Sequence, residues 1–266
     1  MLDVEFAQFS DPGKVRGHNE DYLGFVEPGK AHEPRHRSWL FALADGVGGQ
    51  DRGEVASRAA VEHLLAGFRR LTAGDSLISV LPKLVQAANT HVFETAAAVG
   101  PGGSSMATTI VACALRFDRA IVCHAGDSRC YLIRGGQARQ ITRDHTVTNE
   151  QMLMGLMTAR EAAESGSRNL LSRSLGNEMF VSVETNEYTV QRDDVLLLCS
   201  DGLHGSVKEA DMTRSIQTAR DLESAAKELV SIAKERDGGD NISVQLIRIR
   251  SVERVGMYRG QPYRLP

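Results

Sequence analysis

Hydrophobic periodicity divides the chain into strand-like and helix-like stretches. Residues 4–10 alternate between apolar and polar side chains, and residues 39–44 form a short continuous apolar run, so both are predicted strands. Residues 53–71 and 79–98 repeat apolar side chains every three or four positions, which predicts two amphipathic helices. Pro82 fits the second helix only in its first turn, because a later proline removes a backbone hydrogen bond.

The second half of the chain is dominated by predicted β-structure. Apolar runs predict strands over residues 107–115, 119–125, 129–134, 137–142, 181–190, 195–199 and 241–249. Helical patterns cover residues 146–175, 208–218 and 221–236. Gly135-Gly136 is typical of a two-residue hairpin turn, and Asp221 is a suitable helix N-cap. Hairpin-linked strands with two separate helix pairs predict an α+β fold, with helices outside two packed antiparallel sheets.

Composition narrows the class of protein. The chain has 266 residues, 42% of them hydrophobic, which is enough for one large domain. Its net charge of −3 gives no electrostatic reason to expect a nucleic-acid partner. No apolar run approaches the ~18 residues of a membrane span, and residues 1–5 do not begin a signal peptide, so we expect a cytoplasmic protein without membrane insertion. The four cysteines fall in apolar runs without a C-x-x-C pair, which indicates buried reduced thiols.

Five short acidic motifs each follow or precede an apolar run. They are Asn19-Glu20-Asp21, Asp45-Gly46-Val47-Gly48-Gly49, Gly126-Asp127-Ser128-Arg129, Ser200-Asp201-Gly202 and Gly239-Asp240-Asn241. Each alone is most simply a turn, because Asx side chains bond their own backbone. Together, carboxylates converging from distant strand ends would form the oxygen-rich site that Mg²⁺ or Mn²⁺ prefers. The glycines after Asp45 would let the backbone approach a ligand closely.

The order of these motifs resembles a known family. With Arg16, Met106-Ala107-Thr108-Thr109, Asp144-His145 and Ile242-Ser243, they follow the order found in the metal-dependent serine/threonine protein phosphatases of type 2C. The chain looks like the compact bacterial branch of that family, over roughly residues 4–249. Each motif is weak alone, but the set in register is specific.

The resemblance implies a four-layer αββα sandwich with metals in the cleft between the sheets. The roles it implies are Asp45 as ligand to two metals, Asp201 and Asp240 at the first metal, the Gly46 carbonyl with Glu20 and Asp21 (directly or through water) at the second, Asp127 at a third metal, Arg16 on the substrate phosphate, and Asn241 and Thr108 as support for the ligands. Two to three Mn²⁺ or Mg²⁺ ions per chain are expected, and a metal-activated water would attack phosphorus without a covalent enzyme intermediate.

The same resemblance implies the organisation and partners of the protein. Residues 1–250 would form the catalytic domain, residues 146–175 a flap beside the cleft, and residues 251–266 an Arg- and Pro-containing peripheral tail. The expected substrates are phosphoserine and phosphothreonine proteins in signal transduction, opposite a cognate Ser/Thr kinase. We expect a monomer.

The sequence departs from the family pattern at three places. Val47 stands where many members have His, a candidate proton donor to the leaving oxygen, so the donor here is unassigned. Ala107 replaces a usual Gly, and residues 164–169 lack the His-Pro that often precedes Arg168-Asn169. In the flap, Met residues at 152, 154 and 157 either contact a peptide or pack the flap onto the sheet. His145 is predicted to be a structural hydrogen-bonding residue.

Two alternatives remain at the sequence level. Cys123 and Arg129 fit the Cys-x5-Arg spacing of cysteine-dependent phosphatases, but Cys130 and the residues after it read as a strand instead of the helix that such a loop requires. The second alternative is a catalytically inactive member that binds phosphoproteins as a regulatory module. Such modules typically lack metal carboxylates, and those of the pattern are present here.

Overall fold

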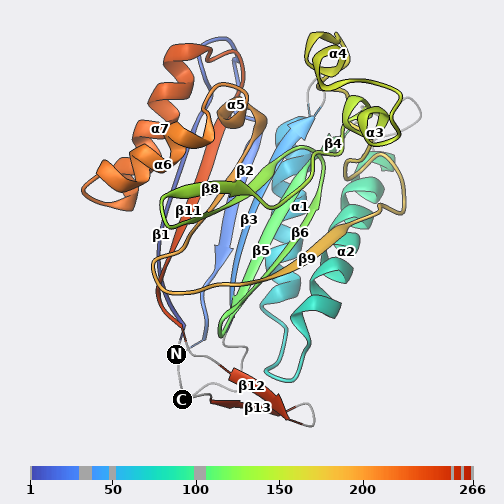
Figure 1. The fold of residues 1–266 in the computed structure, drawn as a ribbon. Helices are drawn as coiled ribbons and strands as arrows, with labels where there is room; N and C mark the ends of the chain where they lie inside the picture. The colour runs from blue at the N-terminus through green and yellow to red at the C-terminus, as the bar shows by residue number, and fades with distance from the viewer. Residues whose placement is uncertain are drawn as a thin grey trace.

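The chain folds into two antiparallel sheets packed face to face, with a helix pair on each outer face (Figure 1). The computed structural model describes residues 2–29, 38–47, 52–98, 106–252, 255–258 and 261–264. Gly48 and Gly49 of the predicted metal motif therefore lie outside the described residues. The predicted α+β sandwich is confirmed.

The first sheet carries the N-terminal helix pair. Its strands, in spatial order, are β2 (Asp21–Val26), β3 (Trp39–Val47), β5 (Ile110–Arg116), β6 (Arg119–Ala125) and β9 (Glu184–Thr189), with β4 (Ala107–Thr108) paired to the end of β3. Its outer face is covered by α1 (Gly53–Phe68) and α2 (Leu77–Ala97).

The second sheet carries the C-terminal helix pair. Its strands, in spatial order, are β1 (Asp3–Asp11), β11 (Ile242–Ser251), β10 (Val195–Cys199), β7 (Arg129–Arg134) and β8 (Gln137–Gln140). Its outer face is covered by α6 (Glu209–Thr218) and α7 (Leu222–Arg236). The short helix α5 (Asp201–His204) follows β10. Residues 146–175, the predicted flap and called the flap below, contain α3 (Val147–Leu153) and α4 (Ala159–Glu164).

Strand alternation divides the core into three layers. In β3, Phe41 and Leu43 point into the layer between the sheets, where they join Leu196 of β10. Leu40 and Ala42 of the same strand point to the layer under α1 and α2. Burying a side chain such as Leu stabilises the fold by about 1.5–3 kcal/mol. These layers fix the strand ends on which the acidic motifs lie.

Several local predictions are confirmed. Gly135 and Gly136 have φ angles of 57° and 79°, as the hairpin between β7 and β8 requires. Asp221 caps α7, because its Oδ1 accepts the backbone N–H of Ser224 at 2.7 Å. All four cysteines are buried free thiols.

Among the described helices, none is long and apolar enough to cross a membrane.

The prediction for Pro82 is wrong. The helix α2 begins at Leu77, so Pro82 is its sixth residue and lies beyond the first turn. Pro82 cannot donate a hydrogen bond to the carbonyl of Ile78 four residues earlier. Ile78 is 39% exposed, so water can take that bond at low cost.

The C-terminal tail contains strands that the sequence did not predict. Strands β12 (Val255–Tyr258) and β13 (Gln261–Arg264) pair as an antiparallel hairpin. The hairpin lies at the end of the molecule opposite α5 and the flap (Figure 1).

Candidate functional site

Five of the predicted acidic residues lie close together at the end of the two sheets that carries α5 and the flap. Asp45 lies near the end of β3, directly opposite Asp21 at the start of β2. Asp201 begins α5 immediately after β10, and Asp240 lies just before β11. The carboxylates of Asp21, Asp201 and Asp240 all act electrostatically on Asp45, as does Asp127 from the turn after β6. The structure thus brings together residues that are far apart in sequence.

Gly46 allows two chain segments to approach closely. A Cβ at this position would overlap the backbone of Gly53, where α1 begins. The Gly46 N–H also donates to the carbonyl of Glu20 at 3.1 Å. The hydroxyl of Ser57 donates to the same carbonyl at 2.6 Å, so the start of α1 holds Glu20 beside Gly46.

Burial and mutual repulsion raise the pKa values of the clustered carboxyls. Burial, together with Asp201 and Asp240, raises the pKa of Asp21 to about 7. Burial, together with Asp21 and Asp201, raises the pKa of Asp45 well above its usual value. Burial, together with Asp201, raises the pKa of Asp127 to about 7. Burial and the charge of Asp240 also raise the pKa of Asp201. The protein's own cations therefore do not offset the mutual repulsion of these carboxylates when they are ionised.

Two carboxylate oxygens in this cluster are buried without a hydrogen bond. Within the described part of the chain, neither Oδ1 of Asp21 nor Oδ1 of Asp201 has a partner. A buried acceptor without a partner costs free energy. Converging carboxylate oxygens match the hard oxygen donors that Mg²⁺ and Mn²⁺ prefer. The residues present therefore fit a site for divalent cations.

Arg16 brings a positive charge to the edge of this cluster. Its Nη2 donates to Oδ2 of Asp240 at 2.7 Å, and its side chain is 49% exposed. The pKa of Glu20 is raised by burial, against the opposing effect of Arg16. Arg16 is thus held by Asp240 and still open to solvent.

Two predicted supporting residues contact the acidic segments. The Asn241 side chain donates to the carbonyls of Pro12 and His18 at 3.0 and 2.9 Å, and its Oδ1 accepts the Glu20 N–H at 2.8 Å. The Thr108 hydroxyl donates to the carbonyl of Asp45 at 2.8 Å.

Sequence reasoning missed one further support, Ser200. Its hydroxyl donates to Oδ2 of Asp21 at 2.8 Å and accepts the Ser243 N–H at 3.0 Å. Its position before Asp201 in an acidic motif was the available signal.

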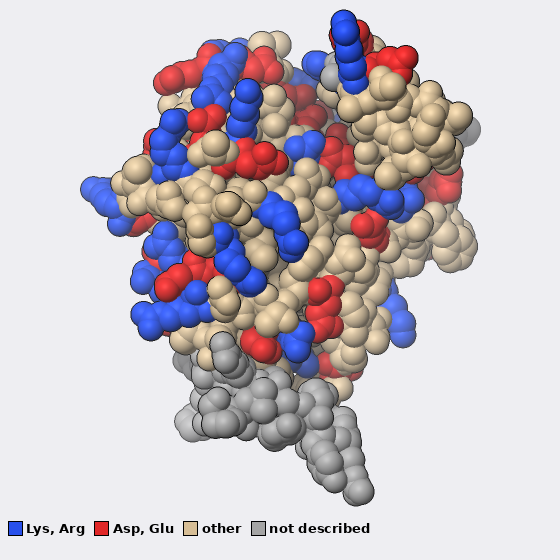
Figure 2. Space-filling model, in the orientation of Figure 1, with Lys and Arg blue, Asp and Glu red and all other residues tan. Residues whose placement is uncertain are grey.

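A cleft runs from the acidic cluster to the flap. Its volume is about 460 Å³, and Asp201, Asp240 and Asp127 line one side. Arg168 and Asn169 of the flap line the other side. Figure 2 shows acidic side chains in the hollow between the flap and the α5 side of the molecule. His204 of α5 also lines the cleft, and its Nε2 donates to the carbonyl of Asp127 at 3.0 Å.

The Cys123 alternative has no support in this geometry. Cys123 is fully buried in β6, and burial raises the pKa of its thiol to about 12. A nucleophilic cysteine needs a lowered pKa. The segment between Cys123 and Arg129 leads into strand β7 and not into a helix.

Comparison with known proteins agrees with the fold. The family model for protein phosphatase 2C matches residues 17–246. A serine/threonine phosphatase, stp, of Listeria innocua is 34% identical over 263 residues, which cover 98% of this chain and 99% of the relative. The solved serine/threonine phosphatase of S. agalactiae has a TM-score of 0.83 at 29% identity and covers 93% of this chain and 100% of its own. The catalytic domain of PstP, solved in complex with 2 manganese ions, has a TM-score of 0.78 at 31% identity, with 94% and 100% covered.

These matches span nearly the whole chain. The chain therefore belongs to the protein phosphatase 2C family. The resemblance noted in its sequence motifs is confirmed.

Proposed function

We propose that this protein hydrolyses phosphoserine and phosphothreonine in proteins with the help of Mn²⁺ or Mg²⁺. Its enzyme class is protein-serine/threonine phosphatase. The observation that carries the metal dependence is the group of buried carboxylates with raised pKa values and unpartnered oxygens around Asp45. A manganese-bound PstP domain with the same fold supports this proposal.

The proposed ligands are those that the resemblance to the family implies, and their proximity in the cluster supports them. Asp45 would contact two ions; it lies opposite Asp21 and is acted on by both Asp201 and Asp240. The full proposed set is Asp45, Asp201 and Asp240 at the first ion, the Gly46 carbonyl with Glu20 and Asp21 (directly or through water) at the second, and Asp127 with Asp201 at a third, weaker position.

The chain's own residues bind and orient the phosphate. When bound, the divalent ions supply Lewis-acid chemistry that acidifies water and offsets charge on the phosphoryl oxygens. Arg16 presents a planar set of donors that keeps its charge at any working pH, and Asp240 holds that set in place. Without cations, the carboxylates around Asp45 would repel a phosphate dianion. Val47 has no ionisable group, so its side chain does not donate the proton to the leaving oxygen.

The proposed partners are phosphorylated proteins and the Ser/Thr kinase that modifies them. The acidic, metal-loaded cleft suits a phosphate carried on an exposed segment of another protein. We propose that the protein acts as a cytoplasmic monomer in signal transduction.

A panel of matched phosphopeptides tests this function. The full chain with Mn²⁺ should hydrolyse phosphoserine and phosphothreonine peptides at least about tenfold faster than the phosphotyrosine peptide, and excess EDTA should abolish turnover. A folded protein that binds phosphopeptides but turns over neither these nor p-nitrophenyl phosphate would instead be a regulatory binding module. Cys123→Ser is the control: full activity in this variant excludes a thiolate nucleophile, while its loss together with insensitivity to EDTA would overturn the proposal.

A further inference from the structure

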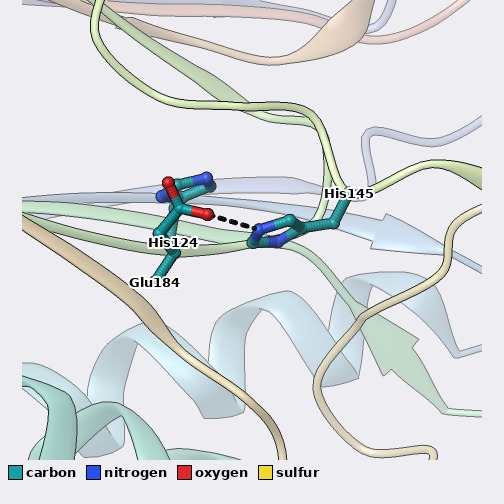
Figure 3. A group of neighbouring side chains, drawn as sticks. All are labelled: His124, His145 and Glu184. Atoms are coloured by element: carbon teal, nitrogen blue, oxygen red, sulfur yellow. Dashed lines mark hydrogen bonds and ion pairs between the residues drawn. The ribbon is translucent and has the colours of Figure 1, made fainter. Parts of the chain in front are cut away.

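A second cluster of potential ligands lies next to Gly126, the residue before Asp127. His124, His145 and Glu184 place one ligand atom each within 4.8 Å of one another, and both histidines are 1% exposed (Figure 3). The two rings stack with centroids 4.6 Å apart and planes 5° apart. The residues come from β6, from the segment before the flap, and from β9.

The contacts of this cluster disfavour a metal. Nε2 of His145 has two neighbours: Oε2 of Glu184 at 3.3 Å, which can accept its proton, and Nη1 of Arg173 at 3.4 Å, which can only donate to an unprotonated Nε2. Because Nδ1 accepts the Gly126 N–H at 3.3 Å, the neutral ring carries its proton on Nε2, toward Glu184. A metal at Nε2 would displace that proton to Nδ1, where it would face the Gly126 N–H. Arg143 already donates to the same Glu184 oxygen at 2.8 Å. The ring of His145 therefore has its two nitrogens committed to protein partners.

His145 makes two hydrogen bonds to Gly126, the residue before Asp127. The backbone N–H of His145 donates to the Gly126 carbonyl at 3.0 Å, while its Nδ1 accepts the Gly126 N–H. Gly126 has a φ of 113°, and a Cβ there would lie 2.6 Å from Cβ of Thr109. The N–H and the carbonyl of this glycine are thus both bonded to one residue, and Asp127 follows directly in the chain.

Neighbouring bonds tie the same turn to the same segment. Arg129 makes a two-pronged pair with Asp144, with distances of 2.8 and 2.6 Å. The carbonyl of His145 accepts the N–H of Ser172, which returns from the flap. The turn that carries Asp127 is therefore joined to both ends of the flap through residues 144 and 145.

We propose that His145 is a positioning residue for the third metal position, and that Glu184 fixes the ring form in which Nδ1 is the acceptor. This inference rests on the proposed role of Asp127 as a ligand. The pKa of His145 is lowered to about 4 by burial, with His124 and Arg173 adding to the effect, so the ring is neutral at neutral pH. A neutral ring can accept from Gly126, whereas a charged one cannot.

Two substitutions separate the nitrogens of His145. In His145→Asn the amide oxygen lies near the place of Nδ1, so the bond from Gly126 can be kept. In His145→Gln the amide lies near the place of Nε2, so the contact with Glu184 can be kept while that from Gly126 is lost. The readout is the binding of Mn²⁺ alone to the metal-free full chain, with free Mn²⁺ measured by electron paramagnetic resonance.

We expect His145→Asn to bind Mn²⁺ like the wild type. His145→Gln should weaken the weakest Mn²⁺ site by about tenfold and leave the tighter sites unchanged. Equal weakening in both variants, or none in His145→Gln, would overturn the positioning role. Asp127→Ala is the control: loss of the weakest site is expected, and its retention would overturn the role of Asp127 instead.

A measurement on the unaltered protein covers the case in which a variant does not fold. The ¹⁵N shifts of the His145 ring, assigned in the wild type, should show a protonated Nε2 and a bare Nδ1. In Glu184→Gln the preference for that form should weaken, because the charge that attracts the Nε2 proton is gone. A protonated Nδ1 in the wild type would contradict the proposal without any variant.

Discussion

Two groups of buried or half-buried carboxylates in this protein have pKa values that are shifted in opposite directions. Asp21, Asp45 and Asp201 repel one another, and their pKa values are raised. Asp144, which lines the same cleft, has a lowered pKa: burial alone would raise it, but the hydrogen bonds and charge of Arg129 outweigh burial. The pKa of Glu184 is lowered as well, since its contacts with His145 and Arg143 outweigh burial.

The difference lies in the partner and not in the residue type. Each carboxylate of the second group receives an arginine, as Asp194 does from Arg134 at 2.8 and 2.7 Å. In the first group, unpartnered oxygens remain on Asp21 and Asp201 among the described residues. A protein that supplies arginines to some buried carboxylates but not to others leaves the latter for a cation from solution. The contrast between these groups is the physical basis of the proposed metal site.

The largest expected effect comes from neutralising the centre of the first group. Asp45→Asn keeps the shape of the side chain but removes the charge that two ions would share. Turnover of a phosphothreonine peptide should fall to below about a tenth of the wild-type value. Asp193→Asn, at a surface position 80% exposed, is the control and should keep full activity. More than a tenth of wild-type turnover in Asp45→Asn would sink the two-metal proposal.

The pH dependence of stability in the metal-free protein sharpens the comparison. Asp127 has a folded-state pKa of about 7, above the value of an unfolded chain, so the folded state holds its proton between about pH 4 and 7. Its contribution to the free energy of unfolding is therefore lost as pH rises through 7. We compare the free energy of unfolding of Asp127→Asn with that of the wild type at each pH. The variant minus wild-type difference should be about 1–3 kcal/mol larger at pH 8 than at pH 5.

Urea unfolding at both pH values measures this difference. Buried histidines with lowered pKa values, such as His204, occur in both proteins, so their opposite pH dependence cancels. A difference that shrinks as pH rises would show that Asp127 is not held in a repulsive environment.

Removing the arginine that pairs with a carboxylate of the second group should leave that carboxylate without a charged partner, as in the first group. Arg134→Gln leaves the buried carboxylate of Asp194 without its charged partner. The free energy of unfolding should fall by about 2 kcal/mol, a moderate value because Arg134 itself is 41% exposed. Mn²⁺ binding should not change. Thermal unfolding of Arg134→Gln beside the exposed Arg192→Gln measures the effect, and equal stability in the two variants would contradict it.

The smallest expected effect concerns Arg16, which acts electrostatically on Asp201 of the first group. Arg16→Ala removes donors for phosphate but no proposed metal ligand, so KM for a phosphopeptide should rise about tenfold while kcat changes less. The KM of Arg16→Lys should lie between that of the wild type and that of Arg16→Ala, because lysine keeps the charge but lacks the planar fork of donors. Steady-state kinetics at saturating Mn²⁺ provide the test. An unchanged KM in Arg16→Ala would remove Arg16 from phosphate binding.

The sequence predicted features whose signals are local or carried by motifs. The strand 39–44 and the hairpin at Gly135-Gly136 follow from periodicity and turn chemistry. The acidic residues were grouped by the order of their motifs, and the structure places Asp21, Asp45, Asp201 and Asp240 within one electrostatic cluster.

The supports of that cluster could not be predicted in the same way. The bonds of Asn241 to Pro12 and His18 join residues more than two hundred positions apart, and they exist only because β1 pairs with β11. The two hydrogen bonds between His145 and Gly126 form only because the fold places the turn after β6 beside the segment before the flap. The strands of the tail hairpin have four residues each, too few to show a pattern of alternation.

The most direct test of the metal site is the addition of Mn²⁺ to metal-free protein while hydrolysis of a phosphothreonine peptide is followed. We predict no turnover before Mn²⁺ is added and full turnover once at least about two ions are bound per chain. Turnover at the full rate in the metal-free protein would contradict the account.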